Sequence, residues 1–498
     1  MDSGVHLCLV LLCLLLVTPL GSAHDYIIQT HGSRRLLHWS GDPGSSPSTT
    51  SCPSIHSSGS SNGNKLPVVH RLSPCSPLGG SRRRRVMASP EKITHRDGLR
   101  MRYLADVKDA TTASPAAPAP APSATPASSF SIPATQNVIS SIPGVYDYTV
   151  VAGYGTPAQP LALYFDASGM SNLRCKPCFT GSGGTACSQA FDPTASSSFQ
   201  SMQCDSPECT ASCFVGPCTF TFQNATFVFG NGTVVTDTLT LSPSATFEDF
   251  AAGCMQLDNL FTNDDIVGNI DLSRSRHSLA SRVLLSSPPG TAAFSYCLPA
   301  DTDTHGFLSI APALSDYSGV AGVKYVPLVN NPRGPNFYFV DLVAINVDGR
   351  DLPFPPAAFR GNGTMIDSQA SFSYLNPPIY AALRDEFRAS MAQYPPVPAF
   401  GGLDTCYNFT GLQEIHLPEI TLRFGNGEFM DLDDRQFMYF FREHLDEDFP
   451  FGCLAFAAAP DETFPWNSLG TQVQRTKEVV YDVRGGQVAF VPSVCGLR

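Results

Sequence analysis

The chain has 498 residues, enough for two domains of ordinary size, and its 31 Lys and Arg against 43 Asp and Glu give a formal net charge of −12. A net negative chain repels phosphate groups, so we expect no nucleic-acid partner. Residues 1–142 hold 13 basic and 7 acidic residues, and the remainder holds 31 − 13 = 18 and 43 − 7 = 36. A basic leader before an acidic body indicates a segment held by charge complementarity, although two unrelated segments of biased composition would give the same counts.

The N-terminus has the pattern of a secretory signal peptide. Its apolar run, Leu9–Val17, is too short to span a bilayer, and Gly21–Ala23 supplies a small-residue cleavage site. We therefore predict a signal peptide at residues 1–23, no membrane span, and a protein that is secreted or delivered to a vacuole.

Two segments of low apolar periodicity follow the signal peptide. Residues 24–110, the leader, are rich in Ser, Gly and Arg and are predicted to be a prosegment with one short helix at 91–109. The run Arg82–Arg85 is a candidate processing site, and equally a solvated basic stretch. Residues 111–142 are rich in Ala, Pro and Ser and are predicted to be a linker without a core.

From Tyr146 onward the pattern changes to short strands separated by Gly, Asn, Asp and Pro. One amphipathic helix is predicted at 378–391, where Ile379, Leu383 and Phe387 recur on one face. About 350 residues of this kind predict an all-β protein with two β-rich lobes and a few short helices. The predicted strands are 146–152, 161–165, 225–230, 238–241, 337–347, 419–424 and 478–483.

The 16 cysteines of an exported chain indicate disulfides, whose connectivity the sequence leaves open. Seven of them fall within 175–218, which is predicted to be a stapled surface insertion. The pair Cys175 and Cys178 lacks a second pair or histidines at ligand spacing, so we expect no metal. Cys8 and Cys13 leave with the signal peptide, and Cys52 and Cys75 lie in the leader. The disulfide candidates are Cys175, Cys178, Cys187, Cys204, Cys209, Cys213, Cys218, Cys254, Cys297, Cys406, Cys453 and Cys495.

Two aspartates occupy the same local position in the two halves of the body. Asp166 directly follows the apolar run 161–165, and Asp367 directly follows Gly363–Ile366. Each aspartate opens a turn of small or polar residues. They lie 367 − 166 = 201 residues apart, about one domain length. One such aspartate is usually a turn former, but two at matching positions predict a duplicated fold with a shared acid–base site.

The motifs around these aspartates resemble those of pepsin-like aspartic proteases, in particular the nepenthesin-type branch of plants. The resemblance covers about 143–498 well and the leader loosely. The matching motifs are Gly153–Pro157, Phe294–Pro299, Phe372–Leu375, Leu403–Asn408, Cys453–Ala457, Val479–Val483 and, in the leader, Val68–Arg71 and Pro74–Pro77.

The resemblance implies a bilobal pepsin-like fold made as a zymogen. Residues 143–320 would form the N-terminal lobe and 321–498 the C-terminal lobe, with a cleft between them for a polypeptide substrate or a protein ligand. It further implies a monomer without cofactor, secreted to the extracellular space or apoplast, or vacuolar.

The same resemblance makes Asp166 and Asp367 the catalytic pair. Two carboxylates a few ångströms apart do not both ionise easily, so they share a proton. One accepts a proton from a bound water that attacks the peptide carbonyl, and the other donates a proton to the carbonyl oxygen. The pair titrates as a unit, with activity expected at acid pH.

The residues after each aspartate depart from the family pattern, Asp-Thr-Gly-Ser or Asp-Ser-Gly-Thr. Ala167 lacks the hydroxyl that bonds the opposite loop, whereas Ser368 keeps one. Ser168 and Gln369 replace glycines, and a side chain there is expected to cost ~1–3 kcal/mol of strain. Gly169 and Ala370 lack the hydroxyls that bond the aspartates, each worth about 1.5–3 kcal/mol.

Further departures lie around the first loop. Asn224 stands near the position of the family's flap tyrosine, with Phe222 the nearest aromatic residue. Ile270–Ser273 replaces a glycine-rich segment, whose second-lobe counterpart Ser468–Gly470 keeps its glycine. Four sequons predict a glycoprotein, with candidate sites at Asn224, Asn231, Asn362 and Asn408.

Three hypotheses remain open on the sequence. The chain is an aspartic endopeptidase of reduced or lost activity, or a non-catalytic pepsin-fold protein that binds or inhibits another protein, as xylanase inhibitor proteins of this fold do, or a product without selected function. The retained aspartates favour the first, and the altered turns favour the others.

Overall fold

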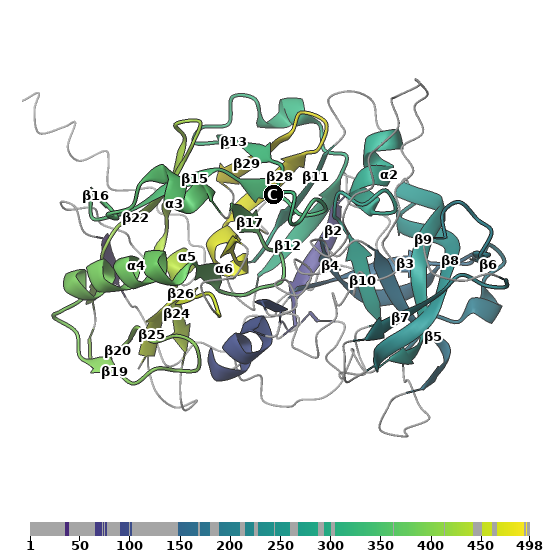
Figure 1. Ribbon diagram of the computed structural model, residues 1–498, viewed down its shortest axis with the longest axis horizontal. Helices are drawn as coiled ribbons and strands as arrows, with labels where there is room; N and C mark the ends of the chain where they lie inside the picture. The colour runs from purple at the N-terminus through teal and green to yellow at the C-terminus, as the bar shows by residue number, and fades with distance from the viewer. Residues whose placement is uncertain are drawn as a thin grey trace, which may run out of the picture.

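The computed structural model describes residues 35–38, most of 65–76 and 90–101, and 148–495 apart from short gaps, the longest being 180–188, 259–266 and 442–450. The predicted signal peptide, the run Arg82–Arg85 and the linker 111–142 lie outside the described residues. The described chain is mainly β-structure with a few short helices, as predicted (Figure 1).

The first lobe is one strongly interconnected sheet in which long strands β8 and β9 form a hairpin. Strand β4 pairs antiparallel with β3 and parallel with β10, so it is central in the lobe. The strands are β3 (Tyr148–Tyr154), β4 (Gln159–Asp166), β5 (Ser171–Phe179), β6 (Gln200–Ser201), β7 (Thr219–Gln223), β8 (Val228–Ser242), β9 (Ala245–Asp258) and β10 (Gly268–Asp271).

A central antiparallel sheet joins the two lobes, and the leader contributes one of its strands. Strand β2 of the leader pairs with β12 over five residue pairs and with β3 over two. The sheet therefore runs from the first lobe through the leader into strands from the end of the chain (Figure 1). Its order is β2 (Lys65–His70), β12 (His305–Ile310), β11 (Ala293–Cys297), β28 (Lys477–Asp482), β29 (Gln487–Pro492) and β13 (Lys324–Val329).

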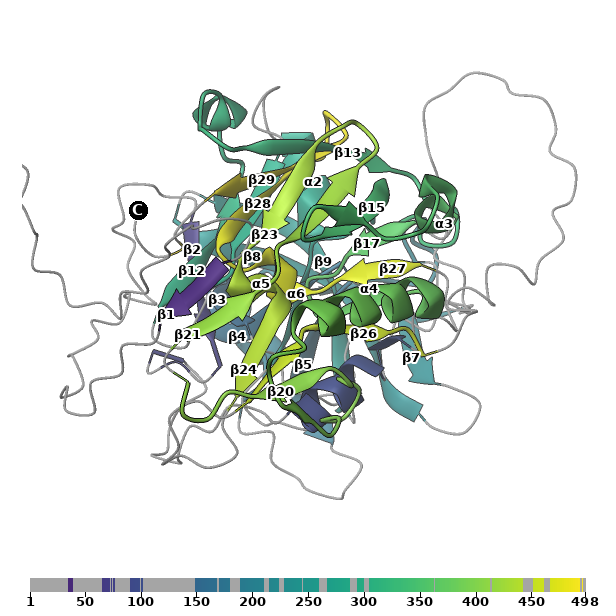
Figure 2. The ribbon, with the colours of Figure 1, turned by 90° about the vertical axis from the view of Figure 1, so that its left-hand side faces the viewer.

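The second lobe repeats the inner arrangement of the first and adds two four-stranded sheets. Its inner strands are β14 (Phe339–Val340), β17 (Thr364–Ile366), β18 (Ser373–Leu375), β26 (Phe456–Ala458) and β27 (Asn467–Leu469). The outer sheets are β16 (Arg350–Asp351), β15 (Leu342–Val347), β22 (Ile420–Phe424) and β23 (Phe429–Leu432), and β19 (Pro396–Val397), β20 (Cys406–Asn408), β25 (Phe451–Leu454) and β24 (Met438–Phe441). Strand β1 (Arg35–His38) of the leader pairs with β21 (Glu414–Leu417) beside them (Figure 2).

The described residues form a few short helices that pack beside the sheets. The predicted helix is α4 (Pro377–Ser390), which buries Ile379, Leu383 and Phe387 on one face. The leader forms a helix over residues 90–98, and Arg100 and Met101 are also helical, which confirms the start of the helix predicted at 91–109. The remaining helices are α2 (Leu279–Ser286), α3 (Pro356–Arg360), α5 (Asp434–Phe437) and α6 (Thr471–Gln474). No helix within the described residues is long and apolar enough to cross a membrane.

Four disulfides have both cysteines in the part of the chain that the structure describes, and these eight cysteines are among the predicted candidates. Cys175–Cys254 joins β5 to β9, so Cys175 belongs to the sheet of the lobe, whereas Cys209–Cys218 closes a loop within the predicted insertion. Cys406–Cys453 and Cys297–Cys495 lie in the second half. Cys204 and, in the leader, Cys75 are also disulfide-bonded. The side chains of Cys178, Cys187 and Cys213 lie outside the described residues.

We expect the disulfides to differ in their effect on stability because the loops that they close differ in length. Cys297–Cys495 spans 198 residues and Cys209–Cys218 spans 9. Chain entropy then predicts a loss of about 5 kcal/mol for Cys297→Ser with Cys495→Ser, and about 3 kcal/mol for Cys209→Ser with Cys218→Ser. Urea unfolding followed by circular dichroism measures both. Equal losses from the two pairs would contradict the prediction.

Candidate active site

Asp166 is the last residue of β4 and Asp367 directly follows β17, and each of these strands pairs in parallel with a later strand of the same lobe. In the first lobe β4 pairs with β10 in a register that places Asp166 opposite Asp271. In the second lobe β17 pairs with β27, and Ile366, the residue before Asp367, lies opposite Leu469. A backbone hydrogen bond then ties each aspartate to the later strand: Leu272 N donates to Asp166 O at 2.7 Å, and Asp367 N donates to Leu469 O at 3.0 Å. The two aspartates therefore hold corresponding places in the parallel strand pairs of their lobes.

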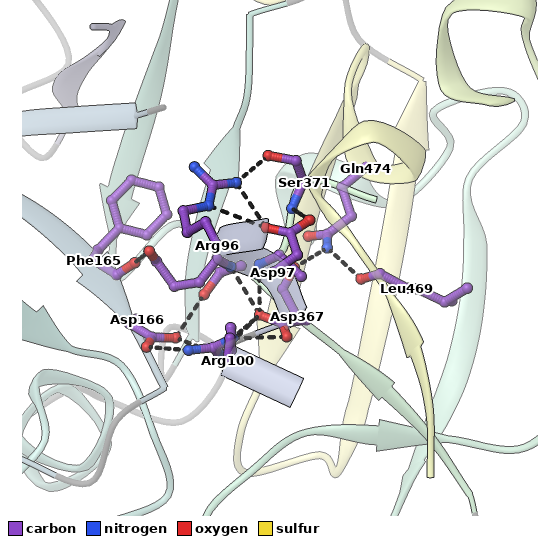
Figure 3. A network of polar contacts seen from close by, with 12 residues as sticks. Arg96, Asp97, Arg100, Phe165, Asp166, Asp367, Ser371, Leu469 and Gln474 are labelled. Carbon is purple, nitrogen blue, oxygen red and sulfur yellow. Dashed lines mark hydrogen bonds and ion pairs between the residues drawn. The ribbon is translucent and has the colours of Figure 1, made fainter. Parts of the chain in front are cut away.

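The guanidinium of Arg100 in the leader binds both aspartates (Figure 3). Nε donates to both carboxylate oxygens of Asp367, at 3.0 and 2.9 Å, and Nη2 lies 2.9 Å from Asp367 Oδ1. Nη1 and Nη2 donate to the two oxygens of Asp166 at 3.1 and 3.2 Å. One planar cation is thus shared by two carboxylates from different lobes, which therefore face the same space.

These three charges are buried, with 1% of Asp166, 1% of Asp367 and 7% of Arg100 exposed. Burial raises the pKa of Asp166 above its ordinary value, the positive charge of Arg100 opposes this, and the charge of Asp367 adds to it. Burial also disfavours the Arg100 cation, but attraction to Asp166 and Asp367 outweighs it, so the pKa of Arg100 is raised. Arg100 stays charged, and any proton taken up at this site goes to a carboxylate.

A second contact fixes the leader one helical turn before Arg100. Asp97 is fully buried, and its Oδ2 accepts hydrogen bonds from the backbone N–H groups of Ser371 and Phe372 at 2.9 and 3.1 Å. Arg96 pairs with Asp97 at 2.9 Å and donates to Ser371 Oγ. Because Asp97 and Arg100 are three residues apart on a helix, their side chains reach neighbouring parts of the same loop.

The second-lobe loop makes backbone contacts with Asp367 although the glycine of the family pattern is replaced. Gln369 N and Ala370 N both donate to Asp367 Oδ1, at 2.9 and 3.1 Å. The backbone of Gln369 is outside the left-handed region, where the described non-glycine residues are Asp249, Ala311, Asp348 and Thr476. The expected strain from a side chain at 369 is therefore not visible in its backbone conformation.

Two side chains of this loop cross to the first lobe. Ser368 Oγ donates to Asp166 Oδ1 at 3.2 Å, and Gln369 Nε2 donates to the backbone carbonyl of Phe165 at 2.7 Å. On the first-lobe side Ala167 contributes only apolar packing. Ser168 and Gly169 lie outside the described residues, as do Asn224, Asn362 and the side chain of Phe222.

The segments that back the two loops differ. Gly470 follows Leu469 and stands against the second loop, where a Cβ atom would lie 2.2 Å from the carbonyl oxygen of Phe372. In the first lobe Asp271 takes the equivalent place, and its carboxylate accepts from the N–H and the hydroxyl of Ser273, both at 2.9 Å. The replacement of the first-lobe glycine is thus accommodated by a local turn.

The buried side chain of Gln474 supports the second-lobe loop that contains Asp367. Gln474 Nε2 donates to the carbonyls of Asp367 and Leu469 at 2.8 and 2.9 Å, and its Oε1 accepts from the hydroxyl of Tyr296. Tyr296 lies 3.0 Å, hydroxyl to hydroxyl, from Tyr481 in the central sheet. The aspartate loop therefore rests on the sheet that joins the lobes.

Sequence reasoning placed the aspartates but missed Arg100, Asp97 and Gln474. Among the described residues no group of three or more His, Cys, Asp and Glu side chains is arranged to hold a metal ion. The remaining candidate sites are separate: Asn231 lies on β8 and Asn408 ends β20, both partly exposed.

Two family models match the chain. Residues 148–310 match the family described as "Xylanase inhibitor N-terminal", and residues 337–492 match "Xylanase inhibitor C-terminal". The first match runs from β3 to β12, and the second runs from just before β14 to the end of β29.

Curated relatives are similar over most of the chain. The chain is 31% identical to Aspartyl protease AED1 of Arabidopsis thaliana over 455 residues, which cover 90% of each protein. It is 27% identical to aspartic proteinase nepenthesin-1 of Nepenthes gracilis over 70% of this chain and 78% of that protein. Among solved structures, basic 7S globulin from soybean has a TM-score of 0.55 at 19% identity, covering 70% of this chain and 95% of that one.

We expect Gln474→Leu to destabilise the protein by about 3 kcal/mol, because it removes three buried hydrogen bonds, those to the carbonyls of Asp367 and Leu469 and that from the hydroxyl of Tyr296. Gln203 supplies a matched control, since its exposed side chain also donates to a carbonyl, that of Ser201 at 3.1 Å. Gln203→Leu should change the free energy of unfolding by less than about 0.5 kcal/mol. Urea denaturation measures both, and similar values for the two variants would refute the supporting role of Gln474.

Proposed function

Because this chain belongs to the pepsin-like aspartic protease family, we propose that it is an aspartic-type endopeptidase made as a zymogen. Asp166 and Asp367 are its catalytic pair, and Arg100 of the prosegment keeps them from substrate. The observation that carries the proposal is the single guanidinium bound to both carboxylates.

This arrangement supports an assembled pair in two ways. An arginine can bind both acids only if they face each other closely, and that arrangement lets two carboxylates share a proton. The backbone donors Gln369 N and Ala370 N hold the carboxyl group of Asp367 in a fixed orientation beside Asp166. Both features persist despite the altered turn sequence.

Once Arg100 leaves, the pair acts on a bound water. One carboxylate accepts a proton from the water as the water attacks the peptide carbonyl, and the other donates a proton to the carbonyl oxygen. The absence of hydroxyls at positions 169 and 370 lowers the rate, since each hydrogen bond to a charged group is worth about 1.5–3 kcal/mol. A polypeptide bound between the lobes is the proposed substrate.

Acid opens the site in this proposal. Arg100 lowers the pKa of Asp166 relative to the value that burial and Asp367 alone would set, so binding of the prosegment favours ionised Asp166. The ion pair is at full strength above the pKa of the released pair, and it is lost as pH falls through the pKa of Asp166 in the closed form. That pKa lies above the ordinary value of 3.8, so release begins in mildly acidic solution.

A second candidate is a non-catalytic protein that binds or inhibits another protein. The matched family models are described by the term xylanase inhibitor, and the glycines of both aspartate turns are replaced. In that case the bonding of Arg100 to the two aspartates is a permanent structural ion pair. Secretion or vacuolar delivery, a monomeric state and glycosylation at Asn231 or Asn408 fit either candidate.

Acidification of the full chain tests the enzymatic proposal. We expect self-processing and cleavage of a denatured protein substrate below about pH 5, and no cleavage by Asp367→Asn, which removes one member of the pair. Gel electrophoresis and mass spectrometry of the fragments measure both. Identical behaviour of the two proteins would favour the binding candidate and end the enzymatic one.

The role of Arg100 is tested by Arg100→Gln. Without the cation, the form in which the prosegment covers the aspartates no longer favours their ionised state. The carboxylates are then protonated at higher pH, so the pH midpoint of self-processing should rise by about one unit or more. Lys92→Gln removes the same charge from an exposed position on the same helix and should leave the midpoint unchanged. Equal midpoints for Arg100→Gln and the wild type would contradict autoinhibition by Arg100.

A further inference from the structure

We propose that Gln369 is a positioning residue that bridges the two lobes and supplies the link between the aspartate turns that Ala167, which has no hydroxyl, does not make. The residue stands where the family has a glycine, so the bridge is a departure from the family pattern. Its catalytic consequence rests on the proposed endopeptidase function, whereas the bridge itself does not.

The bridge reaches a carbonyl just beyond the last residue pair of β4 with β3, at a point where β4 still pairs with β10 on its other side. Strands β3 and β4 pair from Tyr154 and Gln159 up to Val150 and Leu163, and Phe165 lies beyond the last pair. Gln369 Nε2 donates to Phe165 O at 2.7 Å, a short and well-formed bond. This carbonyl belongs to the peptide unit that leads directly into Asp166, so the bond fixes the plane from which the catalytic side chain projects.

The backbone of Gln369 meanwhile serves the other aspartate. Its N–H donates to Asp367 Oδ1 at 2.9 Å. One residue therefore touches the first-lobe turn with its side chain and the second-lobe carboxylate with its main chain. The distance between the two carboxylates depends on this residue at both ends, and a glycine would supply only the main-chain bond.

The bridge matters most after the prosegment leaves. In the closed form Arg100 ties Asp166 to Asp367 directly. When that cation is released, the described polar contacts from this loop to the first-lobe turn are those of Ser368 with Asp166 and Gln369 with Phe165. Gln369 then maintains the spacing that two acids need to share a proton.

The cavity beside Gln369 is too small to hold more than one water molecule in place of the glutamine side chain. A cavity of about 10 Å³ is lined by Tyr148, Phe165, Ser368, Gln369 and Thr471, which is space for one water at most. A truncated side chain at 369 enlarges this cavity. A water molecule that enters this space can bond the Phe165 carbonyl, but it is not covalently attached to the second-lobe loop as the glutamine amide is. The first-lobe turn is then no longer tied to the second lobe at this point, and its mobility increases.

The test compares Gln369→Ala, Gln369→Gly and Gln369→Glu with the wild type in the full chain after acid processing. Alanine and glycine should lower kcat about tenfold with little change in KM, because the bridge positions a reacting group and does not touch substrate. Gln159→Ala is the matched control: its amide also donates to a backbone carbonyl, that of Asp192 at 2.9 Å, but within the first lobe. It should leave kcat unchanged.

The glutamate variant supplies a pH signature. In Gln369→Glu a protonated carboxyl group can donate to Phe165 O, whereas an ionised one cannot and is repelled by the carbonyl oxygen. Activity of Gln369→Glu should therefore approach that of the wild type near pH 3 and fall about tenfold relative to it above about pH 5. A variant that merely loses packing would show the same ratio at both pH values. Gln369→Gly with wild-type or higher kcat would overturn the inference.

Hydrogen exchange of the uncleaved full chain at pH 7 separates this inference from the proposed function. The amides of Asp166 and Ala167 should exchange about threefold faster or more in Gln369→Ala and Gln369→Gly than in the wild type or Gln159→Ala. Unchanged exchange overturns the bridge whether or not the protein cleaves peptides. Faster exchange in a protein that never cleaves retains the bridge and removes only the proposed catalysis.

Discussion

The fold of the site depends on one buried cation between two buried carboxylates. Taking a lone carboxylate out of water costs several kcal/mol, and two adjacent ones repel each other as well. Arg100 offsets both the desolvation cost and the repulsion, because its positively charged guanidinium donates hydrogen bonds to the carboxylates of both Asp166 and Asp367. The leader helix and the hydrogen bonds of Asp97 to the backbone of Ser371 and Phe372 hold this arginine in place. The site is therefore an electrostatic unit formed by the leader and both lobes.

Much of the fold followed from the sequence because its signals are local. The run before Asp166 and the run before Asp367 are apolar strands that end in a turn, and both are strands in the structure. The helix at α4 has a three-residue apolar face and begins at proline, and its bounds differ from the prediction by one residue at each end. Short-range periodicity and turn residues determine such elements almost alone.

The rest of the site could not be read in this way because it depends on contacts across long separations. Arg100 is one of 13 basic residues before position 143, and nothing in its neighbourhood distinguishes it until aspartates 66 and 267 positions later in the chain are brought beside it. Gln369 departs from a glycine pattern, and on the sequence alone that departure indicates damage. Only the position of the Phe165 carbonyl gives the side chain a partner. Disulfide partners are hidden for the same reason.

The place of β2 in the central sheet determines how the leader could be separated from the rest of the protein. Residues 65–70 are hydrogen-bonded to β12 on one side and β3 on the other, and Val68 and Val69 are buried. The leader is therefore an interior component of the fold, and cutting the chain after it does not by itself detach it. Its departure uncovers two strand edges, which are templates for pairing with another chain. Removal of the leader, which the proposed zymogen requires, would therefore need the pairing of β2 with β12 and β3 to break before the leader can dissociate.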